Sequence, residues 1–242
     1  MVAQTDQSGF ISPTDSLART MQGEQIFYLP ENGFTLYRTP NIEDTIGKIE
    51  PLISNRKASK PPLYRDLTQA NIQLKDFKPQ ILSGEHLFKT FDDCWHIPFY
   101  RNESGFVKVL ESYNDSLWIG IDEISAKGFR LTSWIDFYGS DGMMITVPKG
   151  HSVPLLRSPY ADAEVLLQLD DIHFDIRVSY FDENNTDCCE GLYCYVQVVE
   201  YKVHPCFGGG YDEDNIIRKL SGWVKITDEE GKRLILHHAG GC

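Results

Sequence analysis

The sequence predicts an all-β protein with only minor helical content. Its 242 residues are 41% hydrophobic and 24% charged, and they include 19 Gly, 12 Pro, 12 Tyr and 13 Phe. Aromatic residues favour strands, whereas Gly and Pro favour turns, so this composition is typical of short strands joined by many turns. Several segments alternate apolar and polar residues, which is the period of a strand that buries one face. The length allows two domains with packed cores.

The first 29 residues are expected to form an N-terminal extension. Residues 1–30 lack the basic and apolar stretches of a signal peptide, and the start Met1-Val2-Ala3-Gln4-Thr5-Asp6 fits two origins. It is either a cytoplasmic start or the start of a mature periplasmic or extracellular protein whose signal peptide was removed. No run approaches the roughly 18 apolar residues that cross a bilayer, which predicts no transmembrane segment.

Two parts of the chain share one succession of strand and turn signals. Residues 33–49 and 150–169 each contain an apolar strand that ends in Arg-Thr-Pro or Arg-Ser-Pro, then an acidic turn and a second strand. Proline ends a strand because it lacks an amide donor and fixes φ for a turn. We therefore expect structural roles in turns and packing at Arg38, Pro40, Arg157 and Pro159.

Further along, each half contains an alternating strand that begins with an aromatic residue. Residues 106–109 are followed by a strand that opens with Trp118, and residues 195–198 are followed by one that opens with Trp223. Alternation predicts one buried face, so we expect both tryptophans to be packed. The same four signals thus occur twice in the same order, which predicts an internal repeat.

This succession resembles the bacterial SH3 domain, whose repeats show an Arg-x-x-Pro-like turn early and a Gly-Trp-Val strand late. The resemblance implies tandem SH3-like small barrels at residues 30–124 and 147–242. The first copy carries an insertion at about 54–93, where the composition is compatible with one short helix and otherwise irregular structure. The second copy carries a long loop at about 204–220.

Residues 125–146 are expected to connect the two copies as a β-hairpin. Gly139-Ser140-Asp141-Gly142 is typical of a hairpin turn, and it lies between predicted strands at 131–138 and 143–148.

Cysteines offer two alternative interpretations near the C-terminus. Cys188, Cys189, Cys194 and Cys206 lie in one stretch with His204, so either a zinc site or a disulfide is conceivable there. None of the spacings is Cys-x₂-Cys, which favours a disulfide, with Cys194 to Cys206 as the first pairing to consider. We expect no metal ion and no cofactor.

Catalytic motifs are missing from the sequence, so the chain is not expected to be an enzyme. It contains no Gly-x-Ser-x-Gly elbow and no Gly-rich phosphate loop, and Cys94 with His96 fits a buried thiol better than a peptidase nucleophile. A third class, an enzyme whose acidic or thiol site is spread along the chain, has no motif to mark it.

Charge narrows the choice of partner. Asp and Glu number 35 against 23 Lys and Arg, and the net charge of −12 repels phosphate backbones, so nucleic acid is not an expected partner. An acidic surface suits a basic protein partner, or it serves solubility alone.

Tyrosines in turn-like contexts are the predicted ligand-binding residues, namely Tyr113, Tyr160, Tyr193 and Tyr211. The SH3 resemblance implies a non-catalytic adaptor in the periplasm or outside the cell that recognises a peptidoglycan peptide or a protein. The alternative is a cytoplasmic immunity protein whose acidic surface blocks a basic toxin or hydrolase, since charge complementarity speeds association.

Overall fold

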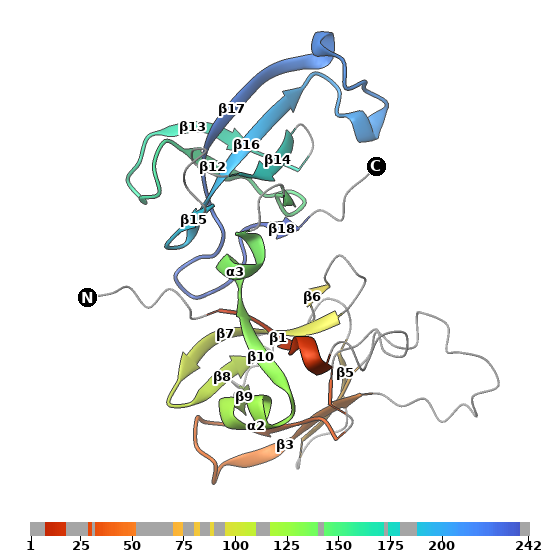
Figure 1. Ribbon diagram of the computed structural model, residues 1–242, viewed down its shortest axis with the longest axis vertical. Helices are drawn as coiled ribbons and strands as arrows, with labels where there is room; N and C mark the ends of the chain where they lie inside the picture. The colour runs from red at the N-terminus through yellow and green to blue at the C-terminus, as the bar shows by residue number, and fades with distance from the viewer. Residues whose placement is uncertain are drawn as a thin grey trace, which may run out of the picture. The chain divides into compact units, whose positions relative to one another are not determined.

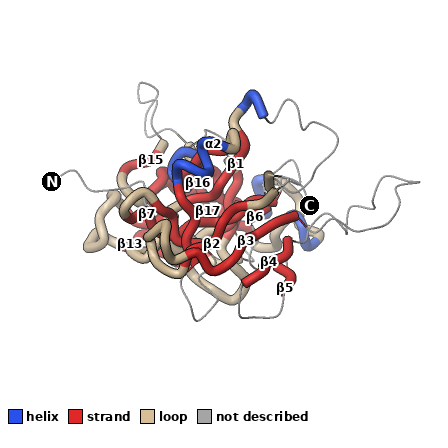
Figure 2. The backbone as a smooth tube through the Cα atoms, turned by 90° about the horizontal axis from the view of Figure 1, so that it is seen from below, coloured by secondary structure: helices blue, strands red, loops and turns tan. Residues whose placement is uncertain are grey.

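A computed structural model describes the chain at residues 8–17, 29–30, 32–51, 70–74, 80–82, 88–89, 95–109, 117–139, 143–171, 174–179 and 188–237 (Figure 1). Within these ranges, strands make up most of the regular structure (Figure 2). They form one 10-stranded and one 8-stranded sheet, whose strand pairs are antiparallel. The predicted all-β class is therefore confirmed. The chain divides into an N-terminal unit, Gln7–Thr132, and a C-terminal unit, Ser133–Cys242.

The strands of the first sheet follow the order β10-β1-β7-β8-β9-β2-β3-β4-β5, and β6 pairs with β7. Their bounds are β1 Gly9–Pro13, β2 Phe34–Tyr37, β3 Thr45–Pro51, β4 Ala70–Leu74, β5 Gln80–Leu82, β6 Phe88–Lys89, β7 Trp95–Glu103, β8 Phe106–Val109, β9 Leu117–Gly120 and β10 Phe129–Ser133. The short helix α2 spans Ile121–Ala126.

Two expectations about this unit are corrected by the sheet order. The N-terminal 29 residues are not only an extension, because β1 pairs with β7 and places Ile11 in the core. The insertion at 54–93 is not simply irregular, because its described parts are β4, β5 and β6, which extend or edge the sheet. Its other residues lie outside the described part of the chain.

Alternation builds the core of the N-terminal unit. In β8, Val107 and Val109 are buried, whereas Phe106 and Lys108 on the opposite face are partly exposed. Apolar residues of the neighbouring strands complete this core, among them Phe34, Leu36, Ile49, Ile97, Phe99, Leu117 and Ile119.

Helix α2 is fastened to β2 by a carboxylate. Glu123 accepts hydrogen bonds from the Thr35 amide at 3.0 and 3.2 Å and from the Thr35 hydroxyl at 3.1 Å. Lys127 donates to Glu123 at 2.7 Å and also to the carbonyl oxygen of Gly33. A side chain thus satisfies a strand amide that would otherwise lack a partner.

The strands of the second sheet follow the order β13-β12-β17-β16-β14-β11-β18, and β15 pairs with β16. Their bounds are β11 Met144–Thr146, β12 Val153–Leu156, β13 Val165–Leu169, β14 Phe174–Val178, β15 Cys189–Glu190, β16 Tyr193–Tyr201, β17 Ile216–Lys225 and β18 Leu236–His237. This unit also holds α3 (Trp134–Tyr138) and the 3₁₀ turns η1 (Pro205–Phe207) and η2 (Glu213–Asn215).

The predicted connecting hairpin at 125–146 is wrong. Residues 131–138 are divided between β10, which belongs to the first sheet, and α3, while β11 belongs to the second sheet. The helix begins at Ser133, whose Oγ accepts from the Asp136 amide at 3.0 Å. Trp134 and Tyr138, four residues apart, lie on one face of the helix and are both buried.

The two units share one arrangement of turn and strand. The Arg38 amide bonds the Asp44 carbonyl, and the Arg157 amide bonds the Glu164 carbonyl. Both hairpins have a register shift before their last pair. Both arginines are exposed at these turns, and the two prolines that follow are partly exposed.

The tryptophans occupy matching places in this arrangement. Tyr37 at the end of β2 pairs with Trp118 on β9, and Leu156 at the end of β12 pairs with Trp223 on β17. Trp118 and Trp223 are both buried, as the alternation predicted.

Candidate functional site

The loop between β16 and β17 is built around one asparagine. Figure 1 shows β16 and β17 as long neighbouring strands that lead to this loop, residues 202–215. The Asn215 side chain donates to the carbonyls of Val203 at 2.7 Å and Gly210 at 2.6 Å, and it accepts from the Val203 amide at 3.1 Å. A Cβ at Gly209 would lie 1.8 Å from the Val203 carbonyl oxygen, so only glycine fits there. These contacts give the loop a defined shape.

This loop presents apolar side chains to solvent. Among the described residues, seven large hydrophobic side chains are exposed, and four of them lie between positions 203 and 217. Phe207 is 68% exposed and Tyr211 is 69% exposed, and Val203 and Ile217 accompany them. Scattered exposed apolar residues are ordinary, whereas a contiguous exposed apolar patch is typical of an interaction site.

Aromatic rings connect the exposed part of the loop to its base. Tyr201 at the end of β16 makes edge contacts with His204 at 5.7 Å and with Tyr211 at 6.4 Å between ring centroids. The rings of His204 and Phe207 follow at 5.9 Å. We call Tyr201, His204, Phe207 and Tyr211 the aromatic cluster.

Asp175 on β14 anchors the aromatic cluster to the sheet. Its Oδ1 lies 2.9 Å from His204 Nε2, and its Oδ2 accepts from the Tyr201 hydroxyl at 3.2 Å. The side chains of Asp175 and His204 are largely buried. Burial, and then the negative charge of Asp175, raises the pKa of Tyr201 to about 12.

A cleft of about 100 Å³ opens beside this anchor. It is lined by residues of β11, of β14, of the β13–β14 connection and of the loop, namely Met144, Ile145, Thr146, Asp171, Phe174, Asp175, Ile176, His204 and Phe207. Small-molecule sites commonly measure about 300–1,000 Å³, so this cleft suits one side chain rather than a whole cofactor.

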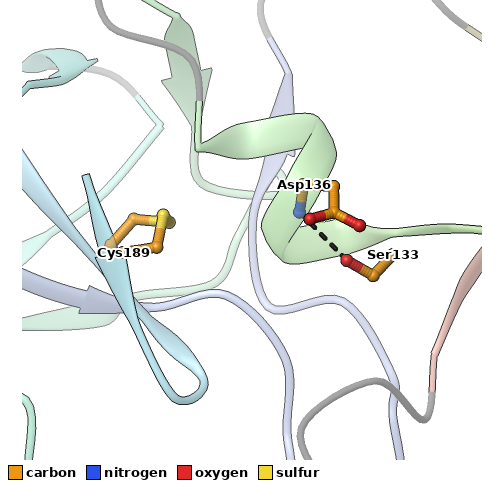
Figure 3. The surroundings of a disulfide bond; sticks show 4 residues. Ser133, Asp136 and Cys189 are labelled. Carbon is orange, nitrogen blue, oxygen red and sulfur yellow. Dashed lines mark hydrogen bonds between the residues drawn. A yellow bond between two sulfur atoms is a disulfide. The ribbon is translucent and has the colours of Figure 1, made fainter. Parts of the chain in front are cut away.

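A disulfide joins Cys189 to Cys194, so the expected pairing of Cys194 with Cys206 is wrong (Figure 3). Cys189 and Cys194 are direct partners on β15 and β16, with their Cα atoms 4.0 Å apart. A Cβ at Gly139 would lie 3.7 Å from Cys189 Sγ, which places the bond beside the end of α3. The Cys206 side chain lies outside the described part.

The Cys189–Cys194 disulfide argues against the alternative of a zinc site at these cysteines. Two of the four clustered cysteines are joined to each other and are no longer thiolate ligands. Within the described ranges, no group of three or more His, Cys, Asp or Glu side chains is arranged to hold a metal ion.

The four tyrosines predicted as ligand-binding residues have different environments. Tyr211 belongs to the aromatic cluster, and Tyr160 is 58% exposed at the turn between β12 and β13. Tyr193 is only 8% exposed and packs with Leu156 and Trp223, which leaves it little surface for a ligand. Tyr113 lies outside the described residues.

No motif in the sequence indicates Asp175, Tyr201 or Phe207 as part of a site. Asp175 and Tyr201 are 26 residues apart, and only the pairing of β14 with β16 brings them together. One available signal was the long loop itself, where aromatic residues flank three consecutive glycines at 208–210.

Comparisons with known proteins do not identify a family for the chain or a function for the site. No protein-family model, curated protein or solved structure matches the chain. None of the helices in the described ranges has the length and apolar character to span a membrane.

Proposed function

We propose that the chain is a non-catalytic binding protein that recognises a protein partner through the loop and cleft of its C-terminal unit. The observation that carries this proposal is an ordered loop that exposes Phe207 and Tyr211 beside a cleft. Exposed aromatic anchors are the residues that dominate binding energy at protein interfaces. Because Asn215 already fixes the loop, little ordering entropy is lost when a partner binds.

The Asp175–His204 pair fits an anchoring role better than a catalytic one. In hydrolases a carboxylate that orients a histidine serves a nearby nucleophile. Here Asp175 also accepts from Tyr201, so the same carboxylate on β14 holds the two inner rings of the aromatic cluster, Tyr201 and His204. This favours a binding protein over an enzyme.

The repeated turn and the matching tryptophans support descent of both units from one SH3-like domain. The Cys189–Cys194 disulfide supports a periplasmic or extracellular location, because disulfides persist in oxidising compartments. A peptidoglycan peptide is the ligand that the SH3 resemblance implies, but apolar rings on an acidic unit fit a protein surface better.

Charge favours one second candidate, an acidic inhibitor or immunity protein. Residues 133–242 contain 18 Asp and Glu against 9 Lys and Arg, whereas residues 1–132 contain 17 against 14. Most of the negative charge therefore belongs to the unit that carries the cleft. Such a surface attracts a basic toxin or hydrolase and speeds its association.

The test is panning of a phage-displayed random 12-mer peptide library on the immobilised full chain. We expect recovery on the wild type to exceed recovery on a Phe207→Ser/Tyr211→Ser variant at least tenfold. The matched control is Ile42→Ser/Val165→Ser, which removes two exposed apolar side chains elsewhere and should leave recovery unchanged. Equal recovery on the wild type and the loop variant would overturn the proposal.

A further inference from the structure

We infer that the cleft binds a cationic side chain on an alkyl stem, such as lysine, from a basic segment of the partner. The inference rests on the proposed binding function and names the chemistry that the cleft selects.

Two carboxylates, Asp171 and Asp175, face the cleft. Among the described residues that line it there is neither Lys nor Arg, and His204 is the one residue with a basic side chain. Asp175 accepts two hydrogen bonds, but a carboxylate offers about four lone-pair positions, so it retains acceptor capacity. The cleft therefore offers negative charge to an incoming group.

The basic residues around the loop include Arg177 on β14, whose charge acts on Tyr201, and three residues that have partners. Lys202 donates to the Asp214 carbonyl at 2.6 Å, and Lys219 lies 3.5 Å from Glu213. Arg218 donates to Glu200. None of these four basic side chains is among the described residues that line the cleft, so its carboxylates can accept from a cation supplied by a partner.

The remaining lining matches the stem of such a side chain. Met144 and Ile145 provide apolar contacts for methylene groups, and a long cationic side chain packs its stem on such surface while its head reaches polar groups. The rings of Phe174 and Phe207 line the same cleft and can attract a cation electrostatically. Its volume of about 100 Å³ fits one side chain.

The net negative charge of the C-terminal unit also favours a cationic occupant of the cleft. With twice as many acidic as basic residues between positions 133 and 242, the unit attracts a basic segment from a distance. A neutral apolar side chain is not attracted by this negative charge. Charge complementarity thus selects lysine over leucine as the occupant.

The test uses the lysine side-chain analogue n-butylammonium chloride as the probe. Amide chemical shifts of the full chain are followed by NMR while this salt or neutral n-butanol is added at constant ionic strength. We expect saturable shifts at Asp171, Asp175 and Phe207, with at least tenfold tighter binding of the cation than of the alcohol. Asp171→Asn should weaken cation binding at least fivefold, whereas Asp212→Asn, on the loop but outside the cleft lining, should not.

Equal binding of the alcohol, or cation-induced shifts only outside the cleft, would overturn the inference. Either result leaves the proposed function standing if library peptides are still recovered through Phe207 and Tyr211. Failure of that recovery overturns the proposed function itself, so the two failures are distinguishable.

Discussion

Replacing Asp175 by alanine tests the anchor of the aromatic cluster. The substitution removes the acceptor of the Tyr201 hydroxyl at 3.2 Å and of His204 at 2.9 Å. A hydrogen bond to a charged acceptor contributes about 1.5–3 kcal/mol, and access of water through the cleft offsets part of the loss, so we expect about 3 kcal/mol in total. Urea unfolding measures this change in the free energy of unfolding.

Hydrogen exchange locates the effect of the same substitution. If Asp175 anchors the loop, the amides of Lys202, Val203 and Gly209, which are hydrogen-bonded in the loop, should lose protection in Asp175→Ala. Asp171→Ala is the matched control, because its carboxylate lines the same cleft without these bonds. The reasoning is refuted if the two variants unfold within about 0.5 kcal/mol of each other, the size of an ordinary surface effect.

Three further predictions follow from other contacts. Because burial and the Asp175 charge raise the pKa of Tyr201 from 10 to about 12, the neutral phenol is favoured in the folded chain. Its stabilisation is complete below pH 10 and lost as the pH rises through 12. Burial also raises the pKa of Tyr37 and of Tyr138, so Tyr201→Phe should reduce the alkaline slope in a pH series of urea unfolding without abolishing it. The double variant Cys189→Ser/Cys194→Ser should lower the melting temperature and cost about 2 kcal/mol, because the closed loop is short. Glu123→Ala breaks the bonds from β2 and Lys127 and should destabilise the N-terminal unit by about 2 kcal/mol, measured by exchange of core amides in β2.

Each of these predictions has a contradicting result. An unchanged alkaline slope in Tyr201→Phe would place the ionisation elsewhere. Equal melting temperatures with and without the Cys189–Cys194 bond would contradict a stabilising disulfide. Unaltered exchange at Thr35 in Glu123→Ala would show that α2 does not hold β2.

Local pattern predicted the alternating strands of both units, but it missed β1, β4, β5, β6 and α3. Alternation predicted strands at residues 106–109 and 195–198. The first segment is β8, and the second lies within β16. Residues 131–138 are apolar at both period 2 and period 3.6, so alternation alone could not separate β10 from α3. The Ser133–Asp136 cap was the signal that distinguishes them.

Register explains why the disulfide and the site were not predictable from spacing. Glu190 pairs with Tyr193 across a two-residue turn, and this register alone places Cys189 opposite Cys194. The positive φ of Gly191 is compatible with that turn. Asp175 meets Tyr201 and His204 through strand pairing and a loop contact, over separations of 26 and 29 residues.

The most direct test of the central claim is hydrogen–deuterium exchange of the full chain with and without its most strongly recovered library peptide. We predict new protection in segments 171, 174–176 and 201–215, which contain the cleft and the loop. Protection confined to other segments, such as the β2–β3 or β12–β13 turns, would contradict the claim that the C-terminal loop and cleft form the binding surface.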